Sequence, residues 1–157
     1  MFFLDYKPPK QLRTLFIVHY APILLTILIG PLTAIYNIWE LPTDKGLTII
    51  FGLLIFLAGT IFYFKWEFFW HRTYHGQLVS TGIFEYIRHP HYTSLIIIEF
   101  GIALFFYSIA GILIAVISVP ILIWSIIDEE KVLIKQYGAS YQKYMKRVPW
   151  RIIPHVF

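Results

Sequence analysis

The sequence Gly82-Ile-Phe-Glu-Tyr-Ile-Arg-His-Pro-His-Tyr92 is polar and charged, and long apolar runs lie on both sides of it. Pro90 fixes its own φ and disfavours helical geometry at His89. Because proline suits the first position of a helix, we expect a helix to begin at Pro90 and to enter a membrane. The first turn of this helix offers free N–H groups and a partial positive charge, and Arg88 adds a full charge. We therefore expect this helix start to hold an anion at the membrane surface.

The apolar runs indicate the class of protein. The chain has 157 residues, of which 58% are hydrophobic and 14% are charged, whereas about a quarter of the residues of a soluble domain are charged. A membrane span needs about 20 residues, and the last apolar run is long enough for two spans with a turn at Tyr107-Ser-Ile-Ala-Gly111. We predict an all-α integral membrane protein with four transmembrane helices, at about 15–37, 46–65, 91–108 and 110–127.

We expect the whole of 1–157 to form a single membrane domain. In this prediction 1–66 is a two-span anchor that stays attached, because its first apolar run is longer than the apolar core of a signal peptide. Residues 67–157 form the cofactor-binding half of the domain. This half contains a helical hairpin at 91–127 and a cytoplasmic tail, whose helical segment completes the cofactor site.

The charge distribution predicts the orientation in the membrane. With four spans, both ends of the chain and the central loop share one side, and every Lys and Arg except Lys45 falls there. Positive charge favours the cytoplasmic side. We therefore expect both termini in the cytoplasm, at the plasma membrane of a prokaryote or the endoplasmic reticulum of a eukaryote. This topology and contacts with anionic lipids account for the net charge of +4 without a nucleic-acid partner.

Three potential metal ligands follow the second apolar run. Glu67, His71 and His75 are spaced by four residues, so they share one face of a helix, and His89 and His91 come shortly after. Imidazole and carboxylate groups in such a pattern are zinc or iron ligands. The chain has no cysteine and only six histidines, which are too few for a di-iron site built on histidine boxes. We predict no metal site, and an interfacial helix whose polar face meets water.

A second charged cluster stands at the end of the last apolar run. Asp128, Glu129 and Glu130 are consecutive acids, and negative charge stabilises the first turn of a helix. We expect them to begin a new helix that ends at Gly138. A helical hairpin returns this cluster to the membrane face where Arg88 lies, so a cation and a helix start face two carboxylates. Such a site suits S-adenosylmethionine, which has a carboxylate, an ammonium, a sulfonium and ribose hydroxyls.

An ordered set of motifs connects these elements. It consists of Gly82-x-Phe84-x-Tyr86-x-Arg88-His-Pro-x-Tyr92, Gly101, Glu129-Glu130-x-x-Leu133, Tyr137-Gly138, Tyr141, Tyr144 and Arg147-Val-Pro149. The set resembles the isoprenylcysteine carboxyl methyltransferases over about half of the chain. The related phospholipid N-methyltransferases have a similar Arg-His-Pro and Glu-Glu arrangement. The chain departs from the pattern at Ser94, where the family often has glycine.

The resemblance implies S-adenosylmethionine as the cofactor and a lipophilic acceptor that enters from the bilayer. The implied cofactor-binding residues are Gly82, Tyr86, Arg88, His89, Pro90, Tyr92, Glu129 and Glu130. The candidates for catalysis are Arg88, His89, Glu130, Arg147 and Arg151.

Methyl transfer from a sulfonium is an in-line displacement that needs alignment and exclusion of water. A carboxylate acceptor needs no base, and Arg147 or Arg151 would position it, unless these arginines only contact lipid headgroups. An amine or thiol acceptor needs a base, for which His89 and Glu130 are the first choices.

Glu99 is the only acid inside an apolar run. It lies nine residues after Pro90, roughly 13 Å along a helix with a rise of 1.5 Å per residue. An acid at the centre of a span costs about 2.5–3.5 kcal/mol on insertion scales. Glu99 lines a tunnel for the acceptor, pairs with His19, or is protonated and bonded to a backbone carbonyl, and the sequence leaves these alternatives open. His19 itself is expected to be a packed, hydrogen-bonded helix residue.

The preferred function is carboxyl O-methylation of a prenylcysteine-like substrate, with a phospholipid amine as the second choice of acceptor. The segment Arg147-Val-Pro-Trp-Arg-Ile-Ile-Pro154 also resembles the C-terminus of membrane sterol reductases, which use NADPH. The consecutive glutamates favour a methyltransferase over such a reductase. A non-catalytic membrane protein that only binds the cofactor is the third alternative.

Overall fold

The computed structural model describes residues 10–157, with side chains from His19 onward. The elements in chain order are α1 (Lys10–Tyr36), α2 (Lys45–Thr73), the 3-10 helix η1 (Gly82–Glu85), α3 (Pro90–Phe105), α4 (Ile109–Tyr137) and α5 (Ala139–Arg147). Within this range no strand forms, and Glu40 and Ser108 make an isolated antiparallel bridge. The predicted all-α fold is confirmed.

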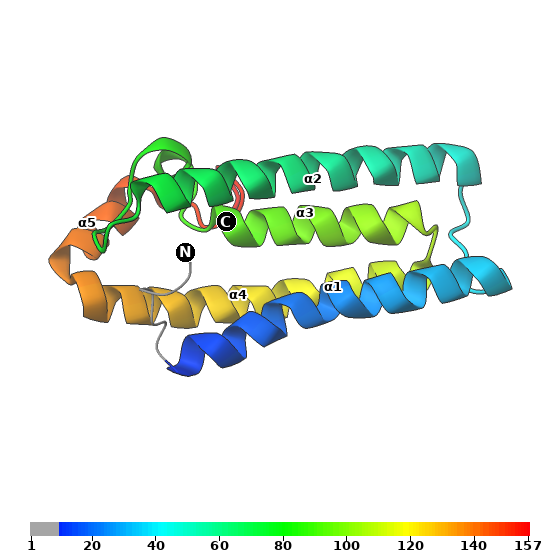
Figure 1. The fold of residues 1–157 in the computed structure, drawn as a ribbon, viewed down its shortest axis with the longest axis horizontal. Helices are drawn as coiled ribbons and strands as arrows, with labels where there is room; N and C mark the ends of the chain where they lie inside the picture. Colours follow the sequence, from blue (N-terminus) through cyan, green and yellow to red (C-terminus); the bar gives the residue numbers. More distant parts are fainter. Residues whose placement is uncertain (1–9) are drawn as a thin grey trace.

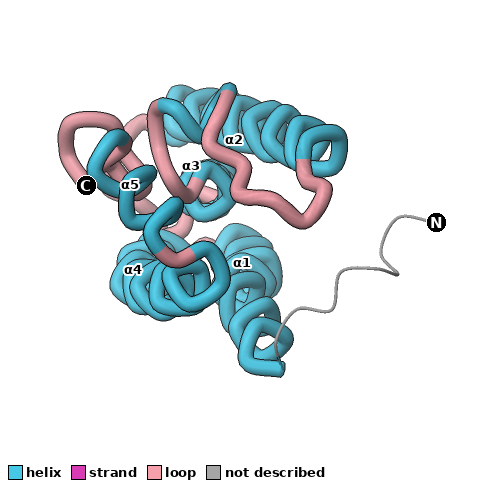
Figure 2. Tube along the Cα trace, turned by 90° about the vertical axis from the view of Figure 1, so that its left-hand side faces the viewer, coloured by secondary structure: helices cyan, strands magenta, loops and turns pink. Residues whose placement is uncertain are grey.

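The four long helices run side by side, and α3 lies among the other three (Figure 1 and Figure 2). It packs against α1, α2 and α4, and its buried residues include Tyr92, Leu95, Glu99 and Ile102. The end of α2, the start of α3 and the end of α4 lie at the same end of the bundle, together with η1 and α5 (Figure 1). We call this the tail end, because residues 148–157, the tail, also fold there.

Three helices contain segments that are long and apolar enough to cross a membrane, namely His19–Tyr36, Lys45–Thr73 and Ile109–Tyr137. Their outward faces expose large apolar side chains such as Leu28, Phe51 and Ile117, as expected for surfaces that meet lipid. The predicted fourth span is α3, which is apolar but has only 16 residues. At 1.5 Å per residue it is about 24 Å long, against a hydrocarbon core of about 30 Å. The chain is therefore an all-α membrane protein with a short central helix.

Several predicted helix boundaries are confirmed, and two are wrong. His89 is the residue before α3, Pro90 is its first residue, and Gly138 ends α4 with a φ of 55°. However, α2 continues past the expected end at 65 to Thr73. The acids 128–130 lie inside α4 and do not begin a new helix, because no glycine or proline interrupts the chain between Pro120 and Gly138.

Glycine allows α3 to lie directly against α2. A Cβ atom on Gly101 of α3 would be 2.5 Å from the backbone nitrogen of Phe56, and one on Gly52 of α2 would overlap the backbone of Phe105. Small residues let helix backbones approach in membranes, where packing and hydrogen bonds drive association. The two backbones are therefore in contact along one side of α3.

We predict that Gly101→Val destabilises the fold by about 1–3 kcal/mol or more, because the added side chain overpacks the contact between α2 and α3. Gly46→Ala is the matched control, since its nearest neighbour beyond the helix backbone is the Asp44 side chain at 3.5 Å. This control should be neutral or slightly stabilising. Denaturant unfolding of both variants in detergent micelles measures the difference, and equal stability would contradict the proposed close contact.

Candidate functional site at the tail end

The tail holds the two residues that precede α3. The N–H of Arg88 donates to the carbonyl of Trp150, and the N–H of His89 donates to the carbonyl of Arg151, both at 2.9 Å. The side chain of Thr93 donates to the carbonyl of Ile152 at 2.9 Å. Pro90 has no N–H group to donate. The turn before α3 is therefore held by the hydrogen bonds of the residues on either side of Pro90. The Arg-His-Pro segment is therefore clamped between α3 and the tail.

The tail is itself closed by its last residue. The carbonyl oxygen of Phe157 accepts hydrogen bonds from the N–H groups of Arg151, Ile152 and Ile153 at 2.7–3.1 Å. The Arg151 guanidinium lies 5.1 Å from the centre of the Phe157 ring. These contacts orient Arg151 toward the end of α4.

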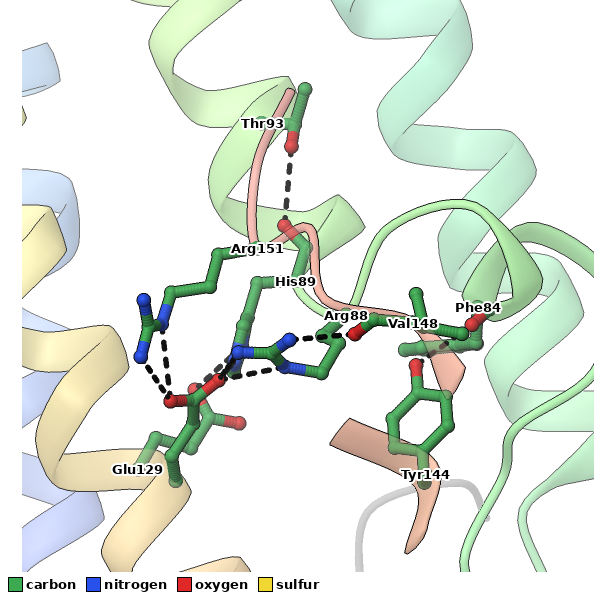
Figure 3. Close-up of polar contacts among 9 residues, drawn as sticks. Phe84, Arg88, His89, Thr93, Glu129, Tyr144, Val148 and Arg151 are labelled. Atoms are coloured by element: carbon green, nitrogen blue, oxygen red, sulfur yellow. Dashed lines mark hydrogen bonds and ion pairs between the residues drawn. The ribbon is translucent and has the colours of Figure 1, made fainter. Parts of the chain in front are cut away.

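Arg88, His89, Glu129 and Arg151 lie close together at the tail end (Figure 3). The carboxylate of Glu130 is the centre of the site, since it is bonded to Arg88, His89 and Arg151. Its Oε1 accepts two hydrogen bonds from Arg88, from Nε at 2.8 Å and from Nη2 at 2.6 Å. Its Oε2 accepts from Nε of Arg151 at 3.1 Å, with Nη2 of the same guanidinium at 3.0 Å. Two guanidinium groups thus share one acid that is only 4% exposed.

Protein oxygens bind three of the five N–H groups of the Arg88 guanidinium. Besides its two bonds to Glu130, its Nη1 donates to the carbonyl of Val148 at 2.6 Å. The residue is 6% exposed. Since a buried charge is tolerated only when it is paired and hydrogen-bonded, Arg88 and Glu130 hold each other in place. Their contact joins the start of α3 to the end of α4, as the hairpin predicted.

Glu129 is placed differently from its neighbour Glu130. Its side chain is 28% exposed, its Oε2 is 3.7 Å from Nδ1 of His89, and no arginine among residues 19–157 lies within ion-pair distance of it. The other ring nitrogen of His89, Nε2, is 3.3 Å from Oε1 of Glu130. His89 therefore lies between the two carboxylates. Of the two acids, Glu129 is the one whose side chain stays partly exposed.

Tyr92 connects this cluster to α1. Its hydroxyl is 3.3 Å from Nε2 of His19, and the two rings meet edge to face at 4.7 Å. Glu129 also interacts with the Tyr92 hydroxyl. His19 is 5% exposed and is the packed, hydrogen-bonded residue that its position predicted. The sequence offered no signal for its partner, which is 73 residues away.

Two buried tyrosines of α5 pack near the charged cluster. The hydroxyl of Tyr144 donates to the carbonyl of Phe84 at 2.8 Å, which ties α5 to η1. Tyr141 is 2% exposed and packs in the same apolar cluster, with Val79 and Val148. Burial raises the pKa of both phenols, so both stay protonated in neutral solution. They act as neutral walls around the charged pair.

Three predicted site residues lie away from the acids. Gly82 has a φ of 62°, and a Cβ atom there would lie 2.6 Å from the Phe69 ring. Tyr86 is 66% exposed. Arg147 is exposed and donates to the carbonyl of Ser80 at 2.7 Å. These three residues shape the η1 loop, whereas Arg88, His89, Glu129, Glu130 and Arg151 come together, with Pro90 and Tyr92 adjoining them.

Of the three potential metal ligands after the second apolar run, Glu67 and His71 form a local pair. Oε1 of Glu67 is 2.8 Å from Nε2 of His71, one helical turn away on α2. Among the described residues, no group of three His, Cys, Asp or Glu side chains is placed to hold a metal ion.

The fold and this site define an all-α membrane protein with a buried arginine just before its central helix. This arginine pairs with an acid of the following helix. The chain belongs to the phospholipid methyltransferase family, whose family model matches residues 46–140, more than half of the chain. The family resemblance predicted from the motifs is thereby confirmed.

Two curated relatives match parts of the chain. It is 31% identical over 77 residues to a protein-S-isoprenylcysteine O-methyltransferase of Schizosaccharomyces pombe, which covers 46% of this chain and 31% of that protein. It is 29% identical over 90 residues to a Delta(14)-sterol reductase of Mus musculus, which covers 52% of this chain and 20% of that protein. The chain therefore spans less than a third of the length of either relative. No solved structure matches it.

We predict that Glu130→Ala lowers the free energy of unfolding by about 3–5 kcal/mol, because it leaves the buried Arg88 without its partner. Glu129→Ala removes a partly exposed acid and should cost about 1 kcal/mol or less. Denaturant unfolding in detergent compares the two variants. A fold that tolerates both substitutions equally would show that Glu130 does not organise the tail end.

Proposed function

We propose that this protein binds S-adenosylmethionine at the tail end and transfers its methyl group to a lipophilic acceptor from the bilayer. The supporting observation is the cluster of Arg88, Arg151 and Glu130, with the accessible Glu129 beside it, in a chain of the phospholipid methyltransferase family. Bound S-adenosylmethionine supplies an electrophilic methyl group on a sulfonium. The protein has to bind this cofactor, align it with the acceptor and exclude water.

The residues present fit such a zwitterionic cofactor. The partly exposed carboxylate of Glu129 can accept a hydrogen bond from an ammonium or a ribose hydroxyl. Arg151 has a guanidinium that is 29% exposed and can turn toward a carboxylate. Arg88 and Glu130 are buried and bound mainly to each other and to neighbouring protein groups, so in this proposal they shape the site and are not its main ligand-binding groups. Tyr92 and His89 lie beside Glu129 and line the same side of the proposed cofactor site.

The acceptor is proposed to be a carboxylate of the prenylcysteine type. Both base candidates are engaged, since His89 lies between two acids and Glu130 accepts from two arginines. A carboxylate is already nucleophilic in neutral solution and needs no base. The exposed Arg147 is the remaining candidate to attract it. The second choice, a phospholipid amine, is supported by the description of the family.

The lipophilic part of the acceptor is proposed to lie along α3 and α4. Side chains of these helices that face outward include Phe105, Ile121 and Trp124, of which Trp124 is 70% exposed. We further propose that the tail end faces the cytoplasm, because it carries the basic residues of α5 and the tail. In this arrangement the reactive end of the lipid meets the cofactor at the membrane surface.

We predict that Glu129→Gln weakens S-adenosylmethionine binding at least tenfold, about 1.4 kcal/mol, because the amide carries no charge for the ammonium. Glu85→Gln, at an exposed acid of η1, is the matched control and should leave the affinity unchanged. Isothermal titration calorimetry with purified protein measures both. Binding of NADPH in place of S-adenosylmethionine would favour the reductase alternative, and cofactor binding without turnover would favour the non-catalytic one.

We predict that a prenylated cysteine analogue is methylated far more efficiently than its unprenylated counterpart. Each buried CH₂ contributes about 0.8 kcal/mol, so shortening the chain should raise KM steeply. Transfer of labelled methyl groups from S-adenosylmethionine measures the difference, with Glu129→Gln as the control for background transfer. Equal use of both analogues would exclude entry from the bilayer, and labelling of phosphatidylethanolamine alone would identify the amine as the acceptor.

A further inference from the structure

Glu99 lies in the interior of the bundle, between α3 and α4. It is 1% exposed, and its Oε2 is 2.6 Å from Oγ of Ser118 on α4, which is also 1% exposed. The two helices also lie close together nearer to the turn that joins them, where a Cβ atom on Gly111 of α4 would lie 3.1 Å from the Cβ atom of Ala103 on α3. The contact between Glu99 and Ser118 is therefore a polar bridge inside an apolar interface.

The hydrogen-bond donors and acceptors around Ser118 indicate whether the carboxyl group of Glu99 is protonated. The Ser118 hydroxyl has one proton but two oxygen neighbours, Oε2 of Glu99 at 2.6 Å and the carbonyl oxygen of Ala115 at 2.8 Å. A carbonyl oxygen has no proton to give. If the hydroxyl proton goes to Ala115, the short contact with Glu99 needs a proton on the carboxyl group. A protonated carboxyl that donates to Ser118, which donates to Ala115, satisfies every contact.

The surroundings of the other carboxyl oxygen agree with this assignment. Oε1 of Glu99 is buried and accepts no hydrogen bond from any residue between 19 and 157. No lysine, arginine or histidine in that range forms an ion pair with Glu99. His19, one of the partners considered from the sequence, contacts Tyr92 instead. An isolated ionised carboxylate is very costly in such a place, whereas the carbonyl oxygen of a neutral acid is not.

We propose that Glu99 is a neutral carboxylic acid that donates its proton to Ser118 and so fixes the position of α3 relative to α4. From this bridge α3 leads back to Arg88 and His89, and α4 leads on to Glu129 and Glu130. A shift or rotation at the bridge displaces the two halves of the tail-end site against each other. Glu99 is thus a positioning residue, and its role does not depend on which ligand the site binds.

Infrared spectroscopy of the purified protein in detergent tests the protonation state. A protonated carboxylic acid has a carbonyl stretch that is separate from those of carboxylates and amides. We expect one such band that persists from mildly acidic to mildly alkaline buffer and is missing in Glu99→Gln. The exposed acids serve as an internal control, because their carboxylates titrate. Absence of a persistent band in the unmodified protein overturns the assignment.

Distance measurements test the positioning role. The chain has no cysteine, so spin labels can be attached to single cysteines introduced at the exposed positions Glu85 and Lys135. In Glu99→Gln, whose amide also donates to Ser118, the distance distribution should be unchanged. In Ser118→Ala, which leaves the acid without a partner, the mean distance should shift or the width of the distribution should at least double. An unchanged distribution in Ser118→Ala overturns the positioning role.

The double variant Glu99→Leu with Ser118→Ala guards against general destabilisation. Replacing both partners by apolar groups removes the polar mismatch, so this variant should fold even if Ser118→Ala does not. If the bridge positions the helices, the double variant folds but has a shifted or broadened distance distribution, like that expected for Ser118→Ala. A narrow, unmodified distribution in the double variant would show that apolar packing alone sets the arrangement.

Discussion

One carboxylate, that of Glu130, determines how the tail end is assembled. Arg88 before α3 and Arg151 in the tail bind its two oxygens from different sides. The buried charges of Arg88 and Glu130 would each be costly without a partner of opposite charge. The helix end, the helix start and the tail therefore become ordered together. The cost of desolvating the three charges means that this arrangement contributes more to specificity than to stability.

The consecutive glutamates have different environments because of helix geometry. Successive residues of an α-helix point about 100° apart at 3.6 residues per turn. Glu130 points into the bundle, where it meets Arg88, while Glu129 points to the edge, near His89 and Tyr92. A pair of adjacent acids can thus combine a structural ion pair with an accessible ligand group. In this division one acid pairs with Arg88 and Arg151, while the other stays partly exposed.

Several polar side chains of the long helices are bonded locally or between helices. Thr26 donates to the carbonyl of Pro22 on α1. Thr33 of α1 donates to Oγ of Ser108, which caps α4. Glu99 and Ser118 form the corresponding link between α3 and α4. In a medium that offers no water, each such group needs a partner in the protein, so these side chains fix the relative positions of the helices.

The sequence by itself determined the elements that depend on local chemistry. The long apolar runs predicted the helices of a membrane protein, Pro90 marked the first residue of α3, and Gly138 marked the end of α4. The motif order and the hairpin also predicted that Arg88 meets the acids at 129 and 130. These features follow from backbone geometry and residue type within a few positions, or from the antiparallel return of one helix beside another.

Only the tertiary structure decided which side chains meet. It showed that Glu130, and not Glu129, accepts from Arg88, and that Arg151 joins this pair while Arg147 does not. It also gave Glu99 a serine as its partner, in place of His19. These contacts join residues between 19 and 42 positions apart. They depend on the rotation and depth of each helix, which are set by packing of the whole bundle and not by any local propensity.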